Sequence, residues 1–176
     1  MQFDAVLRTF SEFFEREGIR YCVVGGLAMQ AWGHSRFTND VDLAVSRSDQ
    51  ARVLAVAESL GYEAFFVSAG FSNHDHRDRA LGRIDFMYPD AQTADRMFDA
   101  AVRRRVIGAI ETPVASAEHL AMMKGLAMKE KPGRIPYDGE DVRHLLSLPG
   151  IDRVSVRDYY VRIGMLELFD VIEKAR

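Results

Sequence analysis

The stretch from residue 23 to residue 45 most constrains how this chain can fold. It begins with an apolar segment that ends in Gly25 and Gly26, passes through a short helix-like segment and a polar turn, and ends in a second apolar segment carrying Asp40 and Asp42. The two apolar segments predict buried strands around a glycine turn and a short helix. Residues two apart on a strand point to the same side, so the two aspartates would project together.

A third carboxylate with matching properties occurs much later in the chain. Asp85 lies inside the apolar segment Ile84-Asp85-Phe86, where an acid without a partner would be costly to bury. Neighbouring carboxylates repel one another unless a cation lies between them, and their hard oxygen atoms suit Mg²⁺ or Mn²⁺. We therefore predict that Asp40, Asp42 and Asp85 form a site for two metal ions. This hypothesis requires Asp85 to lie beside the other two.

A simpler interpretation of the same residues is also open. Asp40 would cap a turn, Asp42 would be exposed on the surface, and Asp85 would pair with an arginine. The glycines would then form only a tight turn.

The polar residues of the stretch suit phosphate binding. Backbone N–H groups at Gly25 and Gly26 can approach a phosphate because no β-carbon blocks them. Arg36 and Thr38 fall in the turn before the aspartates, where a guanidinium and a hydroxyl can contact phosphate oxygens. Alternatively, Arg36 would form a salt bridge with one of the two aspartates.

The remaining periodicity predicts an α/β (α+β) fold with a small mixed sheet, flanking helices and a helical C-terminal part. Helices are expected over 3–17, closed by Gly18, over 49–60 with Ser48 as N-cap, and over 93–102. Extended segments are expected at 20–24, 41–45, 62–67, 83–88 and 106–114. Further helices are expected at 116–130, 138–147, 155–163 and 165–174. We predict a core of residues 1–115 and a helical extension of residues 116–176 packed on it.

Composition narrows the class of protein. The chain has 176 residues, of which 48% are hydrophobic and 28% charged, and a net charge of -3, so no overall positive field favours nucleic acid or membranes. A local basic groove would still suffice for RNA. The single cysteine, Cys22, is expected in the core. We find no signal peptide pattern and no apolar run near the roughly 20 residues that span a bilayer, so we expect a cytoplasmic protein.

These motifs resemble those of a known superfamily. The glycine pair, thirteen further residues and then the two aspartates resemble the signature of the nucleotidyltransferase fold of the DNA polymerase β superfamily, in the order Gly25-Gly26, then Asp40-Val41-Asp42. The pattern Arg36-x-Thr38-x-Asp40-x-Asp42 is similar to that of the abortive-infection nucleotidyltransferase toxins of type IV toxin–antitoxin systems and related minimal nucleotidyltransferases. This chain is shorter than the full toxins.

The resemblance implies a mixed-sheet α/β core, two divalent ions, and transfer of a nucleoside monophosphate from an NTP, such as ATP, to a hydroxyl. Asp40 and Asp42 would be metal ligands, Asp85 the third carboxylate, and Gly25 and Gly26 would face the triphosphate.

A second motif of this family is a serine followed by a helix that carries a lysine. Ser116 and Lys124 resemble it, so Lys124 would reach a phosphate as a point charge. The alternative is a solvated helix lysine. Asp138 and Asp141 are expected to be structural, capping a helix or orienting Lys124.

Three functions remain open from the sequence. The first is nucleotidyl transfer to tRNA, to a protein or to a small molecule such as an antibiotic. The second is a catalytically silent nucleotide-binding module, one half of a toxin–antitoxin pair with a cognate antitoxin or regulator. The third is a metal-dependent hydrolase. The NTP base and the oligomeric state are not predicted.

Two further clusters have simpler interpretations. His74 and His76 are expected in a polar loop or hairpin rather than in a metal site. Arg103 to Arg105 is expected at a solvated helix end rather than on RNA phosphates.

Overall fold

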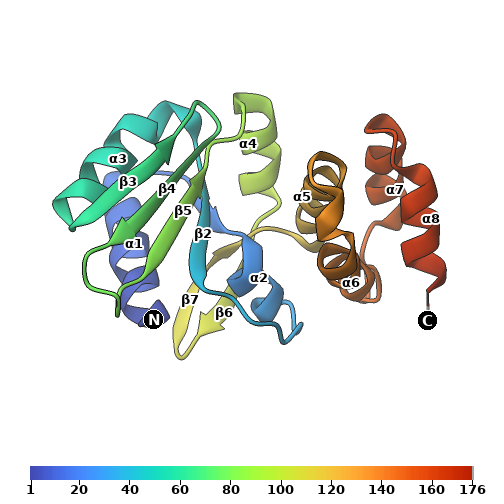
Figure 1. The fold of residues 1–176 in the computed structure, drawn as a ribbon, viewed down its shortest axis with the longest axis horizontal. Helices are drawn as coiled ribbons and strands as arrows, with labels where there is room; N and C mark the ends of the chain where they lie inside the picture. Colours follow the sequence, from blue (N-terminus) through green and yellow to red (C-terminus); the bar gives the residue numbers. More distant parts are fainter. Residues whose placement is uncertain (176) are drawn as a thin grey trace. The chain divides into compact units, whose positions relative to one another are not determined.

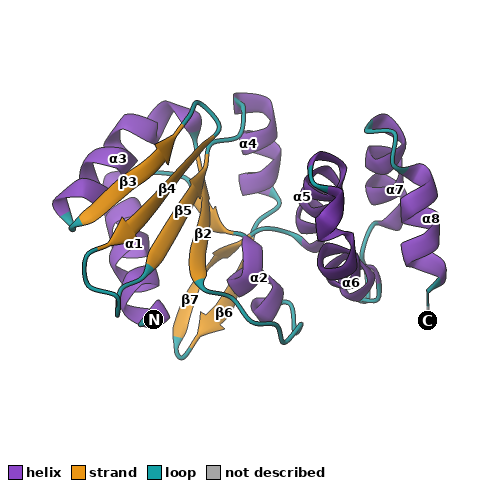
Figure 2. Cartoon of the chain, viewed as in Figure 1, coloured by secondary structure: helices purple, strands orange, loops and turns teal. Residues whose placement is uncertain are grey.

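The computed structural model describes residues 1–175, which form two compact units, one of residues 1–115 and one from Ser116 onward. The first unit combines a sheet with helices, and the second is entirely helical (Figure 1, Figure 2). This confirms the predicted α/β class with a mixed sheet. No helix within the described residues is long and apolar enough to cross a bilayer.

One mixed sheet of seven strands forms the framework of the first unit within residues 1–175. The strand order is β3-β4-β5-β2-β1-β7-β6. The pairs β2–β5 and β1–β7 are parallel, and the other neighbouring pairs are antiparallel. The strands are β1 (Tyr21–Val23), β2 (Asp40–Val45), β3 (Tyr62–Val67), β4 (Phe71–His76), β5 (Arg83–Met87), β6 (Val102–Ile107) and β7 (Ile110–Val114).

Two helices cover one face of the sheet, and Figure 1 shows α1 (Phe3–Glu17) and α3 (Gln50–Ser59) together behind it. The ring of Phe10 on α1 lies 5.4 Å from that of Phe86 on β5, in edge-to-face contact. Because side chains alternate along a strand, the neighbours of Phe86 point to the opposite face. The packed face is therefore the core, and the opposite face of β5 carries Asp85.

The ends of these helices partly match the predictions. Helix α1 ends at Gly18, which has φ 64°, as expected. Ser48 is not an N-cap, because residues 47–49 form a 3₁₀ turn and α3 begins after Asp49. The Ser48 hydroxyl instead lies 2.9 Å from the Ser46 hydroxyl. The helix α4 (Ala91–Asp99) begins earlier than predicted, because the side chain of Asp90 caps it.

Of the two forms predicted around His74, the structure shows the hairpin and not the loop, because His74 and His76 lie on strand β4, which pairs antiparallel with β3. His74 is buried on the core side, and its Nε2 lies 2.9 Å from the Ser72 hydroxyl, which lies 2.8 Å from the Tyr88 hydroxyl. The polar side chains pair with one another, so a polar segment can form a central strand.

Arg103, Arg104 and Arg105 lie on strand β6, not at the predicted helix end. The guanidinium of Arg104 lies 3.5 Å from the centre of the Trp32 ring, and it donates to the carbonyl oxygen of Ala31 at 3.3 Å. These contacts hold the C-terminal end of α2 (Gly25–Ala31) against the sheet. Three consecutive arginines show no two-residue alternation of apolar and polar side chains, so the sequence does not indicate the strand.

The second unit contains, within residues 116–175, the four helices α5 (Ala117–Glu130), α6 (Ile135–Leu146), α7 (Arg153–Arg162) and α8 (Leu166–Lys174). Ser116 caps α5 by accepting a hydrogen bond from the backbone N–H of His119 at 3.2 Å. The hydroxyl of Tyr160 on α7 donates to the carbonyl oxygen of Ala121 on α5 at 3.1 Å. Helix α6 begins three residues before its predicted start, because Pro136 is accommodated in its first turn.

Candidate active site

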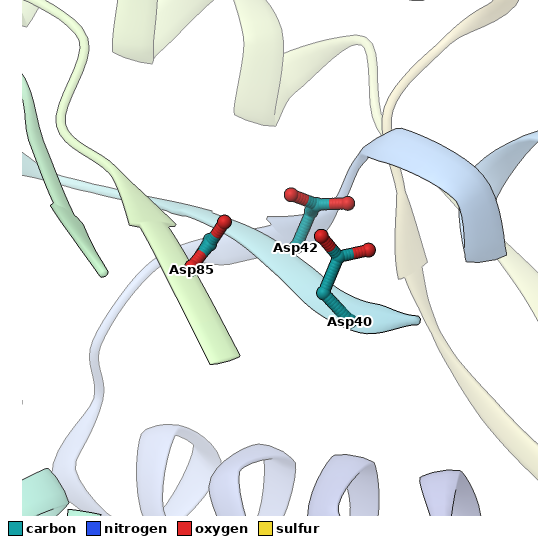
Figure 3. A group of neighbouring side chains, drawn as sticks. All are labelled: Asp40, Asp42 and Asp85. Atoms are coloured by element: carbon teal, nitrogen blue, oxygen red, sulfur yellow. The ribbon is translucent and has the colours of Figure 1, made fainter. Parts of the chain in front are cut away.

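Asp40, Asp42 and Asp85 converge on one face of the sheet, as the metal hypothesis requires. Strands β2 and β5 run parallel, and their register places Asp42 directly opposite Asp85. One carboxylate oxygen from each of the three lies within 4.8 Å of the others. Figure 3 shows all three carboxylates projecting to the same side of the two strands.

The three carboxylates fit a divalent cation. Each is partly buried, which lowers the dielectric screening of their mutual repulsion, and each offers a hard oxygen ligand. Among residues 1–175 this is the one group of three acidic, histidine or cysteine side chains whose ligand atoms converge. Asp40 and Asp42 from β2 and Asp85 from β5 are therefore the residues that would hold Mg²⁺ or Mn²⁺.

The glycine pair makes room for the side chains of this site. Gly25 has φ 61°, and a β-carbon there would lie 1.9 Å from the Oδ2 atom of Asp42. A β-carbon on Gly26 would lie 2.5 Å from the side chain of Thr38. The start of α2 thus approaches strand β2 so closely that only glycine fits. Close packing against Asp42 explains Gly25, and close packing against Thr38 explains Gly26, whereas the sequence suggested only a turn or a phosphate contact.

Thr38 orients one carboxylate of the group. Its hydroxyl donates to Oδ1 of Asp40 at 2.8 Å, which restricts the rotation of that side chain. Arg36 lies in the same turn, which is anchored where the side-chain amide of Gln30 donates to the Arg36 carbonyl oxygen at 2.8 Å. The turn before β2 is therefore tied both to α2 and to the acidic group.

Sequence reasoning missed the arginine that contacts the third carboxylate. Arg83 donates from Nε to Oδ1 of Asp85 at 2.8 Å and from Nη2 to Oδ2 at 2.9 Å. These hydrogen bonds raise the pKa of Arg83. Asp85 thus both converges with the other acids and pairs with an arginine. The signal in the sequence was the two-residue spacing from Arg83, which places both side chains on one face.

Lys124 is enclosed by acids within the helical unit. Its Nζ lies 2.8 Å from Oδ1 of Asp138 and 2.7 Å from Oδ2 of Asp141, and all three side chains are buried. The alternative of a solvated helix lysine is therefore wrong. Burial alone would raise the pKa of Asp138, but Arg134 and Lys124 outweigh it and hold that pKa below its usual value. A phosphate contact of Lys124 stays a prediction.

The comparisons with known proteins show a likeness in structure. No protein-family model and no curated protein matches the sequence. The solution structure of the antibiotic-resistance factor ANT(2'')-Ia shares 17% identity and a TM-score of 0.71, over 97% of this chain and 99% of that protein. A crystal structure of ANT(2'')-Ia holds adenylyl-2''-tobramycin.

Two further structures agree with this likeness. An antigenic nucleotidyltransferase-like protein from Paracoccidioides brasiliensis shares 16% identity and a TM-score of 0.59, over 96% of this chain and 91% of that one. The lincosamide antibiotic adenylyltransferase LnuA, solved with lincomycin, shares 16% identity and a TM-score of 0.56, over 81% of this chain and 96% of that one. The chain therefore has the nucleotidyltransferase fold.

Proposed function

We propose that this protein is a metal-dependent nucleotidyltransferase that moves a nucleoside monophosphate from an NTP to a hydroxyl acceptor. The observation that carries this proposal is the convergence of the Asp40, Asp42 and Asp85 carboxylates within 4.8 Å. The nucleotidyltransferase fold supports it, because ANT(2'')-Ia matches over almost its whole length.

The reaction exchanges one bond to the α-phosphorus for another. The acceptor hydroxyl oxygen bonds to the α-phosphorus, the bond from that phosphorus to pyrophosphate breaks, and the hydroxyl loses its proton. Divalent cations neutralise the charge on the phosphates when they are bound. Positioning and charge neutralisation dominate such a transfer, so the chain needs few groups beyond its carboxylates.

Each predicted site residue has a role in this proposal. Asp40 and Asp42 ligate the cations, and Thr38 fixes the orientation of Asp40 through its hydroxyl. Asp85 supplies the third carboxylate, whose oxygen atoms can ligate a cation or accept the hydroxyl proton. The backbone at Gly25, where no β-carbon intervenes, borders the triphosphate.

Two further cations serve the phosphates in this proposal. Arg36 offers a guanidinium from the turn that precedes β2. Lys124, which is paired with Asp138 and Asp141, offers an ammonium as a point charge.

A small molecule is the acceptor that we propose first. Two of the structurally similar proteins, ANT(2'')-Ia and LnuA, are named for antibiotics, and this chain covers at least 96% of the length of each. The open face beside Asp85 also carries exposed aromatic rings, those of Phe65 and Phe71, on which an organic acceptor can pack. A toxin–antitoxin role with a cognate antitoxin rests on the Arg36-x-Thr38-x-Asp40-x-Asp42 pattern alone.

Transfer of radiolabel tests this proposal. The protein is incubated with Mg²⁺ and each of the four α-³²P-labelled NTPs, with aminoglycosides, lincosamides, tRNA or cell protein as acceptors. We expect one acceptor class to become labelled by the wild type and not by Asp42→Asn. Nucleotide binding without labelled product would favour a catalytically silent module, and release of free NMP alone would favour a hydrolase. Labelling that is equal in Asp42→Asn would refute the proposed site.

A further inference from the structure

Arg83 contacts the acidic group but has no assigned role in the proposed transfer. Its side chain is 40% exposed and could reach water, yet the guanidinium occupies both oxygens of Asp85. Building on the proposed function, we propose that Arg83 is a built-in counter-cation that competes with the second divalent ion for Asp85. Without nucleotide, the site then binds one divalent ion tightly rather than two.

The charges of the group favour this arrangement. Asp40, Asp42 and Asp85 contribute three negative charges and Arg83 one positive charge, which leaves two negative charges for one divalent ion. A second divalent ion beside Asp85 would lie next to the guanidinium and be repelled by it. The negative phosphates of a bound NTP would supply the charge that this second ion needs.

The surroundings of Arg83 hold it in this place. Its guanidinium carbon lies 4.8 Å from the centre of the Phe65 ring, which is a cation–π distance. Strand pairing places Asp40 on one side of Arg83 and Asp75 on the other. Arg83 donates both of these guanidinium hydrogen bonds to Asp85 rather than to Asp40 or Asp75.

A second carboxylate makes the contact reversible. Asp75 is the cross-strand neighbour of Arg83 on β4, and it lies on the side away from the acidic group. It is exposed, and it does not belong to the three converging acids. Asp75 therefore offers the guanidinium an alternative partner once a cation takes Asp85. Arg83 in this scheme is a positioning residue, because it acts through the carboxylate that it occupies.

Titration with Mn²⁺ in the absence of nucleotide tests this inference, with free Mn²⁺ followed by electron paramagnetic resonance. We expect the wild type to bind one ion tightly and Arg83→Gln to bind a second ion at least about ten-fold more tightly than the wild type does. Arg83→Lys keeps the positive charge, so it should stay close to the wild type. Asp75→Asn removes the alternative partner and should weaken the second ion further.

The matched control removes a positive charge just beyond the end of β4. Arg77 follows β4, and its guanidinium pairs with Glu63, which is not one of the three converging acids. Arg77→Gln should leave the Mn²⁺ isotherm unchanged. If Arg77→Gln strengthened binding of the second Mn²⁺ as much as Arg83→Gln does, overall charge would explain the effect and the inference would be overturned. Unfolding temperatures of the variants establish that each one is folded.

The remaining outcomes separate this inference from the proposed function. Two tight ions in the wild type, or identical isotherms for wild type and Arg83→Gln that Asp42→Asn abolishes, would overturn the role of Arg83 alone. No Mn²⁺ binding by any variant, even with a non-hydrolysable NTP analogue present, would overturn both.

Discussion

Asp42 and Asp85 are direct cross-strand neighbours on the parallel strands β2 and β5, although 43 positions separate them in the chain (85 minus 42). The pairing fixes their relative position through backbone hydrogen bonds rather than through a flexible loop. A carboxylate pair placed in this way is held close despite its repulsion, because the strands cannot move apart without breaking the sheet. Such preorganisation suits the binding of cations.

Gly25 is expected to tolerate no side chain. In Gly25→Ala the new β-carbon would overlap the Asp42 carboxylate at 1.9 Å and would also sit at φ 61°. We expect a loss of about 2–5 kcal/mol in the free energy of unfolding, together with loss of cation binding. Gly33→Ala is the control, because its φ of 86° is also positive but its β-carbon meets nothing within 4 Å. It should cost only about 1–2 kcal/mol. Equal losses in urea unfolding would contradict the proposed overlap.

Replacing Lys124 should destabilise the helical unit. Lys124→Met leaves Asp138 and Asp141 buried without their shared cation, so we expect a loss of about 3–5 kcal/mol at neutral pH. Lys129→Met on the exposed face of the same helix should change stability by no more than about 0.5 kcal/mol. Calorimetric unfolding of both variants provides the comparison, and similar melting temperatures would show that the buried ion pairs contribute little.

The stability of the sheet unit should depend on pH through His74. Burial lowers the pKa of His74 below its ordinary value of 6.5, and the nearby Asp85 offsets this only in part. As the pH falls below 6.5, His74 therefore binds a proton in the unfolded chain more readily than in the folded chain. Stability is full above pH 6.5 and falls as the pH drops from there through the folded pKa of His74. Urea unfolding between neutral and mildly acidic pH measures the effect.

The control for this prediction is a histidine of the other unit. His74→Gln should flatten the decline in stability below neutral pH, whereas His144→Gln should retain it. A decline that persists unchanged in His74→Gln would assign the pH dependence to other groups.

The local signals in the sequence were sufficient for most of the fold. The apolar periodicity predicted α1 and the helical character after Ser116, because these segments bury an apolar face. The aromatic residues of the segment 62–67 predicted its strand, in which Tyr62 alone is buried. Apolar periodicity does not reveal strands that are mostly polar. The polar sequence of β4 does not distinguish a hairpin strand from a loop, because the partners of its buried Ser72 and His74 side chains depend on the folded structure and no local pattern reveals them.

The site was predictable where a residue's chemistry was at odds with its surroundings. Asp85 stood out because it interrupts an apolar strand, and the structure places it beside Asp42. Arg83 did not stand out, because a charged residue at the start of a strand is ordinary and its partner depends on side-chain geometry. The space that Gly25 leaves for Asp42 is likewise a property of the folded backbone.

Calorimetric binding of a non-hydrolysable NTP analogue tests the central claim most directly, because it needs no knowledge of the acceptor. With Mg²⁺ present, we predict saturable binding by the wild type that disappears on addition of EDTA and in Asp40→Asn and Asp42→Asn, with all variants still folded. Binding that is equally strong without a divalent cation, or that is undiminished in Asp42→Asn, would contradict the claim that these carboxylates form a metal–nucleotide site.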